Sequence, residues 1–264
     1  MISVLVIAGT GRHYLSAALG SLVAQDMCEW EAIVVECCDT ADDTAKIHAQ
    51  IQEVHDDRIR LFPYDAERGW PPYASRKWNW ALKRAAGSLV AFLDDDDMKG
   101  PGWLGAMCAP LVGDDSIDVT LCRGRTIDKD GNEIGPFFGH PSLDYNVLLT
   151  PSPITTGQLV IRRRTLKDVG GFDGDLPCSE DWDLCLRLSK YSWRYIEHVV
   201  MMHRVNVDNA CYHPTVDHFT KEALRTIIFK HGLAMDRCWR CGASKDTTRD
   251  PWCGRCFTPT SAIS

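Results

Sequence analysis

The sequence predicts an α/β fold with a mostly parallel central sheet flanked by helices. First, residues 89–93 (LVAFL) are apolar without a polar break, as in a strand that is buried on both faces of a parallel sheet. Second, strand-like segments alternate with segments of helical periodicity through the first hundred residues. The 264 residues, 45% of them hydrophobic, suffice for one large domain with a small appendage.

The first half of the chain contains the regular part of this alternation. Strands are predicted at 3–8, 31–36, 58–62 and 89–93, and helices at 14–25, 42–54 and 75–86. Glycines follow the first strand at positions 9 and 11, but a dinucleotide fingerprint would need a third glycine where Tyr14 stands. These glycines therefore predict a strand-to-helix turn and no dinucleotide site.

The second half is less regular. Turn residues at 128–132 (DKDGN) predict a hairpin between strands at 117–123 and 126–134. Further strands are expected at 159–163 and 193–202, helices at 103–111 and 217–232, and an irregular stretch at 137–152. A tight GGFD turn at 170–173 precedes a helix to about residue 190, for which Ser179 suits the N-cap.

Four carboxylates, residues 94–97, follow the apolar run at 89–93 directly. Ligands of open α/β sheets bind at the carboxyl ends of strands. Adjacent carboxylates repel one another unless a cation lies among them, and oxygen ligands favour Mg²⁺ or Mn²⁺ and thus a phosphate-bearing substrate. The alternative is an acidic turn on a solvated face.

Composition limits the function classes. The net charge of −7, without a block of Lys or Arg, argues against broad binding of nucleic acid or membrane surfaces. No apolar run has the length of a membrane span, and no basic segment precedes the first strand. These features predict a cytoplasmic protein without a transmembrane segment. Eight of the twelve cysteines are scattered between residues 28 and 211, and we expect them to be reduced.

The segments EAIVVE, LVAFLDDDD, GGFD and SEDWDLCLR occur in this order. Together they resemble the inverting family 2 glycosyltransferases, which have the GT-A nucleotide-diphosphosugar fold, over residues 3–204. The resemblance implies transfer of a sugar from a nucleotide diphosphate, most simply a UDP-sugar, to an acceptor hydroxyl that the sequence does not identify. It divides the chain into a nucleotide-sugar-binding half (1–105), an acceptor-binding half (106–215) and a C-terminal segment (216–264).

The resemblance also implies roles for acidic residues. Asp94, Asp95 and Asp96 match the family's DxD motif: Asp96 would ligate the Mn²⁺ or Mg²⁺ ion, and Asp94 and Asp95 would support that ion or hold the ribose. His203 corresponds to a late metal ligand of many GT-A enzymes. Asp181 matches the catalytic base and Glu180 its neighbour in an ED pair. The alternative for this pair is simple helix-start electrostatics.

The nucleotide side is implied less specifically. At the end of the first strand the resemblance implies Ala8 and Gly9, and at the end of the second strand Glu36 and Asp39. At the start of the helix at 75–86 it implies Arg76 and Lys77, whose charges can face a diphosphate. Both strand ends differ from the family's usual residues, so the choice of nucleobase stays open.

Four cysteines near the C-terminus form two CxxC pairs separated by eleven residues: Cys238, Cys241, Cys253 and Cys256. This spacing predicts a structural Zn²⁺ site in a small ribbon-like segment, with disulfides as the alternative. Other functions stay open: a sugar nucleotidyltransferase on a related fold, a zinc-ribbon binding module with a degenerate transferase domain, and a glycosyltransferase that acts on hydroxylated bases in DNA.

Overall fold

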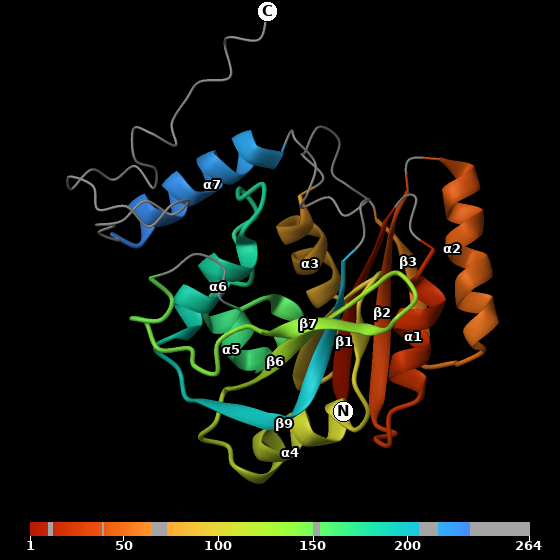
Figure 1. Cartoon of the computed structure of the whole chain (residues 1–264), viewed down its shortest axis with the longest axis horizontal. Helices are drawn as coiled ribbons and strands as arrows, with labels where there is room; N and C mark the ends of the chain where they lie inside the picture. Colours follow the sequence, from red (N-terminus) through yellow and green to blue (C-terminus); the bar gives the residue numbers. More distant parts are fainter. Residues whose placement is uncertain (10–12, 39, 65–72, 150–153, 206–215, 233–264) are drawn as a thin grey trace, which may run out of the picture.

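The computed structural model describes residues 1–9, 13–38, 40–64, 73–149, 154–205 and 216–232. In this part of the chain, nine strands form one sheet between two layers of helices (Figure 1). Along the sheet the order is β3-β2-β1-β4-β8-β6-β9-β5, and β7 pairs with β6. The strands are β1 (Ile2–Gly9), β2 (Trp30–Cys37), β3 (Ile59–Pro63), β4 (Leu89–Asp94), β5 (Met98–Lys99), β6 (Val119–Ile127), β7 (Glu133–Phe138), β8 (Leu159–Arg162) and β9 (Trp193–Arg204).

Helices cover both faces of the sheet. Three of them pack on one face and four on the other. The first group is α1 (Leu15–Val23), α2 (Ala41–Val54) and α4 (Trp103–Gly113); the second is α3 (Ala74–Leu82), α5 (Arg163–Asp168), α6 (Glu180–Leu188) and α7 (Val216–Lys230). A 3₁₀ turn, η1 (Thr156–Gln158), precedes β8. No described helix is long and apolar enough to cross a membrane.

The central strands are buried on both sides, as predicted. In β4, Val90 and Phe92 pack in one core cluster, and Leu89, Ala91 and Leu93 pack in the other. A strand with both faces covered must be apolar at successive positions, which explains the unbroken run. This run places Asp94 at the carboxyl end of β4, where the apolar layers stop.

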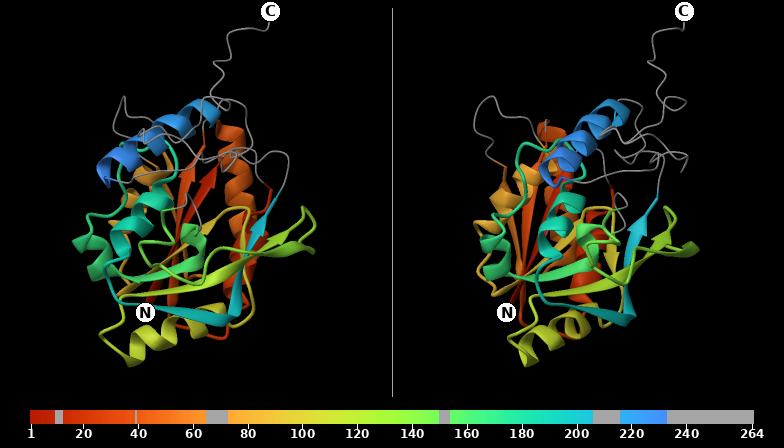
Figure 2. Two further views of the ribbon diagram at one scale, coloured as in Figure 1. Left: turned by 60° about the vertical axis from the view of Figure 1, so that its left-hand side comes forward. Right: turned by 90° about the vertical axis from the view of Figure 1, so that its left-hand side faces the viewer.

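The sheet is mixed, so the prediction of a mostly parallel sheet was wrong for its second half. Pairs β1–β2, β1–β4, β2–β3 and β6–β9 are parallel, whereas β4–β8, β6–β8, β6–β7 and β5–β9 are antiparallel. Because β8 runs between β4 and β6 in the opposite direction, the regular strand–helix alternation ends there. Figure 2 shows the second half of the sheet twisted across the first.

The predicted hairpin is present with different strand bounds. Strand β6 continues through Gly124 to Ile127, where two separate strands were expected on either side of residues 124 and 125. A Cβ at Gly124 would lie 2.0 Å from the Phe138 ring, so glycine is required where β7 crosses β6. The turn forms as predicted, with the Asp128 carboxylate accepting from the amides of Asp130 and Asn132.

The start of α6 differs from its predicted form. Ser179 is the N-cap residue by position, but its φ is 58° and its side chain makes no capping hydrogen bond. Its backbone is in the left-handed region, where the chain turns sharply into α6. The carboxylates in the first turn of α6 therefore lie at a helix start without a serine side-chain cap. Helix α5 was not predicted, because its six residues are too few to show a helical period.

Candidate active site

Three parallel strands end together and gather most of the predicted nucleotide-side residues. The register pairs Gly9 with Cys37 and Ile7 with Asp94. The amide of Gly9 donates a 2.7 Å hydrogen bond to Oδ2 of Asp95. Ala8, Gly9, Glu36, Asp94 and Asp95 therefore lie along one edge of the sheet, as expected for a ligand site of an α/β protein.

The acidic run folds into a buried turn. Asp95, Asp96 and Asp97 are each at most 3% exposed. Asp97 accepts from the backbone amide of Arg204 at 2.9 Å, and the Arg204 guanidinium donates from Nε to the carbonyl of Asp96 at 2.9 Å. The end of β9 thus holds the turn in place, and the solvated acidic loop is excluded for these three residues.

His203 lies beside this turn. Its Nδ1 is 3.0 Å from Oδ1 of Asp97. Burial lowers the pKa of His203, but its hydrogen bond to the Asp97 carboxylate and the charges of Asp97, Asp94 and Asp96 raise it more, so the net shift is upward. A metal-ligating histidine commonly bonds a carboxylate through its other ring nitrogen. Asp97 has that relation to His203, and the sequence did not single it out among four adjacent aspartates.

The residues fit a divalent cation only as a partial site. Within the described ranges, no three His, Cys, Asp or Glu side chains are grouped so that they could hold a metal ion. Mg²⁺ is usually held by one or two carboxylates together with substrate phosphates. The hard oxygen ligands at Asp94 and Asp96, with the imidazole of His203, are compatible with a site that a bound diphosphate completes.

Glu180 and Asp181 begin α6 and are partly buried. Burial, the neighbouring Asp181 charge and the charge of Asp94 raise the pKa of Glu180. Burial raises the pKa of Asp181, and the Trp182 amide, which donates to Asp181 at 2.7 Å, opposes this only in part. The charge of Asp94 thus contributes to the electrostatic environment of Glu180, although the two residues are far apart in the sequence.

Arg76 and Lys77 point in different directions from α3. Burial raises the pKa of the Cys37 thiol to about 11, and the charge of Lys77 counteracts this rise, so Lys77 lies beside the end of β2. Arg76 instead donates from Nε to the carbonyl of Gly174 at 2.6 Å and pairs with Asp175 at 3.0 Å. Of the two cations, Lys77 is the one at the strand ends.

Other predicted residues are placed as follows. The carboxylate of Glu36 accepts from the Thr44 hydroxyl at 2.6 Å and lies 3.2 Å from His48 Nε2, so α2 holds it. Trp182 is fully buried and donates to the carbonyl of Leu148, so it is a core residue. Asp39 and the four paired cysteines Cys238, Cys241, Cys253 and Cys256 lie outside the described residues.

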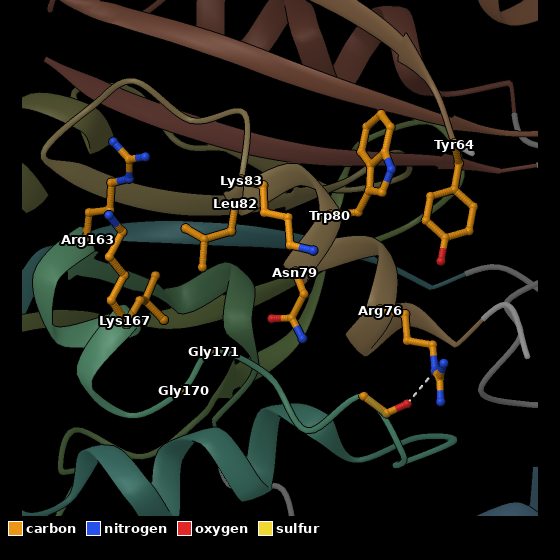
Figure 3. A pocket seen from close by; sticks show the side chains of 12 residues that line it. Tyr64, Arg76, Asn79, Trp80, Leu82, Lys83, Arg163, Lys167, Gly170 and Gly171 are labelled. Atoms are coloured by element: carbon orange, nitrogen blue, oxygen red, sulfur yellow. Dashed lines mark hydrogen bonds between the residues drawn. The ribbon is translucent and has the colours of Figure 1, made fainter. Parts of the chain in front are cut away.

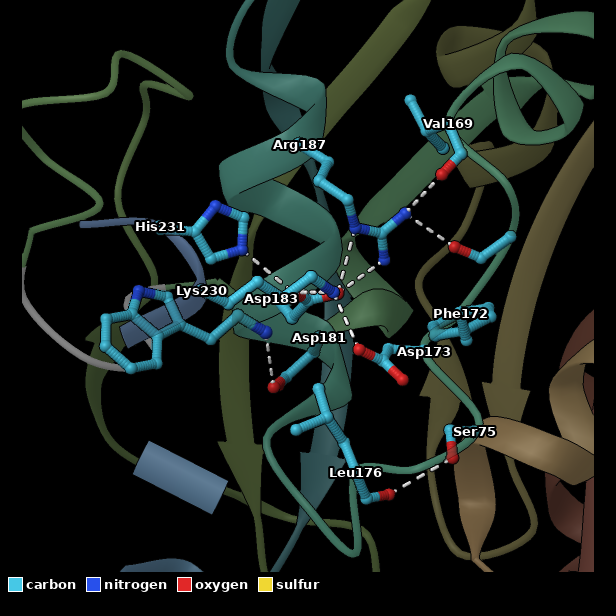
Figure 4. A network of polar contacts seen from close by, with 12 residues as sticks. Ser75, Val169, Phe172, Asp173, Leu176, Asp181, Asp183, Arg187, Lys230 and His231 are labelled. Carbon is cyan, nitrogen blue, oxygen red and sulfur yellow. Dashed lines mark hydrogen bonds and ion pairs between the residues drawn. The ribbon is translucent and has the colours of Figure 1, made fainter. Parts of the chain in front are cut away.

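A charged cluster at Asp183, which we call the α6–α7 clamp, joins two helices on this side of the molecule (Figure 4). Fully buried Asp183 accepts from Arg187 at 2.6 Å, Lys230 at 2.9 Å and His231 at 2.8 Å. Burial would raise the pKa of Asp183, but the hydrogen bond from His231 and the charge of Arg187 hold it well below the usual range. The i,i+4 spacing of Asp183 and Arg187 was visible in the sequence; the contribution of α7 was not.

The comparisons with known proteins identify the family. The family described as glycosyl transferase family 2 matches residues 3–170, more than half of the chain. An Escherichia coli relative, the UDP-Glc:alpha-D-GlcNAc-diphosphoundecaprenol beta-1,3-glucosyltransferase WfgD, is 26% identical over 72% of this chain and 70% of its own length. The pre-mycofactocin glycosyltransferase of Mycobacterium tuberculosis is 28% identical over 58% of this chain, which spans only 31% of that protein.

Solved structures share the fold. Staphylococcus aureus TarS, residues 1–349 in complex with UDP-GlcNAc, gives a TM-score of 0.63 at 21% identity, covering 87% of this chain and 66% of that one. A Pyrobaculum calidifontis mannosyltransferase in complex with GDP-Man and Mn²⁺ gives 0.61 at 19% identity, covering 87% and 63%. The family match and the shared fold thus define the class as a glycosyltransferase of GT-A-like fold. The chain belongs to glycosyl transferase family 2.

Proposed function

We propose that the protein is a metal-dependent inverting glycosyltransferase that moves a sugar from a nucleotide diphosphate, most simply UDP, to an acceptor hydroxyl. The observation that carries this proposal is the proximity of two acidic groups of different character. The charge of Asp94, at the end of β4, contributes to the raised pKa of Glu180 in the first turn of α6, which supports placing both groups in one site. In this proposal the donor-binding carboxylates and the candidate base face the same space.

The donor side uses the ends of β1, β2 and β4. Of the predicted ligands Asp96, Asp94 and His203, one or two would hold Mn²⁺ or Mg²⁺ and the donor diphosphate would complete the site; the ion when bound neutralises the charge of the leaving nucleoside diphosphate. Gly9 fixes Asp95 through its amide, and Asp97 fixes His203. Lys77 would add a positive charge beside the diphosphate, and the strand ends at Ala8 and Glu36 would face the nucleoside.

The acceptor side uses the start of α6. Asp181 would accept the proton of the acceptor hydroxyl as its oxygen attacks the anomeric carbon from the face opposite the leaving group. Because burial raises the pKa of Asp181, its carboxylate is a stronger base than an exposed aspartate. Attack from the opposite face inverts the anomeric configuration. Glu180, in its ionised form, would add to the negative potential around Asp181.

Support for the donor and acceptor classes comes from the relatives. The TarS structure holds UDP-GlcNAc, and the Pyrobaculum structure holds GDP-Man and Mn²⁺. WfgD is named for transfer to a sugar, so we propose a saccharide acceptor. The four C-terminal cysteines would bind one structural Zn²⁺, separate from the exchangeable ion at Asp96. In that arrangement the zinc segment stabilises the C-terminus or contacts a partner.

The decisive experiment compares Asp181→Asn with Asp173→Asn, a matched substitution on the turn before α6. With Mn²⁺ present, a panel of nucleotide sugars is screened for thermal stabilisation, because a ligand of the folded state raises stability by mass action. Asp181→Asn should keep donor binding and lose roughly 10²-fold or more of turnover, whereas Asp173→Asn should keep both. The product should carry the inverted anomer by NMR. Near-normal turnover in Asp181→Asn, or a retained anomer, would contradict the proposal.

A further inference from the structure

A groove beside the active site has a lining that the glycosyl transfer described above does not use (Figure 3). It has a volume of about 650 Å³ and lies between α3, α5 and the Gly170–Gly174 turn. Arg163 and Lys167 stand at one end of it, and Tyr64 and Arg76 stand at the other. The groove therefore extends away from the strand ends along the outer side of α3.

The charge of the groove is unusual for a protein of net charge −7. Its described lining has four cationic side chains and no carboxylate. Arg76 is partly neutralised by Asp175 at 3.0 Å. Lys83 and Lys167 are exposed, and Nε of Arg163 is buried without a hydrogen-bond partner among the described residues.

Hydrogen bonds join the two walls of the groove. Asn79 of α3 donates to the carbonyl of Phe172 at 2.8 Å and accepts from its amide at 2.9 Å. A Cβ at Gly171, whose φ is +71°, would lie 2.5 Å from Oδ1 of Asn79, so glycine permits this contact. Ser75 also bonds the carbonyl of Leu176. These bonds hold one wall of the groove against the other.

The same two walls reach the active site. Helix α3 carries Lys77 at the strand ends, one residue from Arg76, and the turn from Gly170 continues to Glu180 and Asp181. Aromatic rings of Tyr64 and Trp80 line the groove near this end. Arg84 lies over Trp80 at 3.1 Å, so one face of that ring is covered. A ligand in the groove would meet the four cations, the polar side chain of Asn79 and the rings of Tyr64 and Trp80.

We infer that this groove binds a phosphorylated segment of a saccharide acceptor and so selects anionic glycans; this rests on the proposed transfer to a saccharide. A short segment responds mainly to nearby cations, since charges beyond roughly 8–10 Å are screened at physiological salt. A long polyanion such as nucleic acid would also meet the overall charge of −7. The observations therefore favour a phosphorylated glycan over nucleic acid.

The test measures binding by calorimetry without donor or divalent ion, using phosphorylated maltohexaose and unphosphorylated maltohexaose as a matched pair. Lys83→Gln combined with Lys167→Gln removes two exposed cations and should leave the fold intact. Affinity for the phosphorylated chain should fall about 3- to 10-fold, as for loss of two exposed charge pairs, and should depend less on salt. Lys129→Gln combined with Lys190→Gln, which removes two exposed lysines outside the groove, should bind like the unchanged protein.

Equal affinity for the two maltohexaoses, or equal losses in the two double variants, would overturn the inference. A thymidine hexanucleotide that binds as tightly and with the same dependence on Lys83 and Lys167 would overturn the choice of a glycan. Because the calorimetry measures binding and not sugar transfer, a negative result for the groove can be distinguished from a negative result for the proposed transferase activity. Transfer to neutral sugars without binding of the phosphorylated chain would remove only the groove, and binding without any sugar transfer would remove only the enzymatic role.

Discussion

Replacing Asp183 with asparagine should destabilise the protein strongly. Its carboxylate is fully buried, and Oδ2 accepts from Arg187 at 2.9 and 2.6 Å while Oδ1 accepts from His231 at 2.8 Å. Asparagine keeps the shape but removes the charge, which leaves the Arg187 cation without its counterion and takes away one of the two carboxylates that contact Lys230. Breaking a buried ion pair in this way costs about 3–5 kcal/mol. For a chain of this size that corresponds to a fall in Tm of roughly 6–20 °C.

Thermal and urea unfolding at pH 7 measure this loss. Because the pKa of Asp183 is depressed in the folded state, its stabilising contribution is complete above the ordinary aspartate range and is lost only as pH falls toward the depressed value. Asp173→Asn is the control, since Asp173 also contacts Lys230, at 2.7 Å, but is 26% exposed. It should cost no more than about 1 kcal/mol. Equal losses in the two variants, or a loss below about 1 kcal/mol for Asp183→Asn, would refute the reasoning.

Other expected outcomes follow from the same contacts. With chelator present, Glu180→Gln should be more stable than the unchanged protein by about 1 kcal/mol or more at pH 8, and similar to it near pH 4.5. The reason is that the pKa of Glu180 is raised in the folded state, so the unchanged protein loses stability as the pH rises above the pKa of an unfolded-state glutamate. Equal pH profiles of the two proteins in urea unfolding would contradict this. Asp96→Ala should abolish Mn²⁺-dependent binding of UDP in calorimetry without unfolding the protein. Lys77→Gln should weaken UDP binding by about 3- to 10-fold while Arg76→Gln leaves it unchanged, and the reverse order would show that Arg76 contacts the diphosphate. Elemental analysis should find about one zinc per chain, and Cys253→Ser should lose it; zinc-free protein with these cysteines in disulfides would exclude the site.

The sequence predicted those parts of the fold that depend on local pattern. The unbroken run of β4 indicated a strand buried on both faces, and the structure places its end at a buried acidic turn. The turn chemistry at Asp128 indicated the hairpin. The direction of β8 was not predictable, because its three apolar residues, followed by Arg162, pair equally well in either direction and only contacts with β4 and β6 decide it.

Parts of the site that depend on distant contacts were also hidden. Asp97 differs from Asp94 to Asp96 only through its contacts with His203 and Arg204, more than a hundred residues away. Adjacent residues Arg76 and Lys77 looked alike in the sequence, but the helix turns one toward Gly174 and the other toward the strand ends. Periodicity shows which residues share a face; it does not show what lies opposite that face.

The first turn of α6 contains acidic residues in two opposite electrostatic states. Asp183 is surrounded by Arg187, Lys230 and His231, and its pKa is depressed. In the described part of the chain, no cation makes an ion pair with Glu180 or Asp181, and the pKa of both is raised. Interaction with the helix dipole alone would not explain why the cations contact only Asp183 among these three carboxylates in the described part of the chain. A cation beside a carboxylate stabilises its charged form and makes it a weaker base, so the fold lowers the basicity of Asp183 and raises that of Asp181, as the proposed role of Asp181 requires.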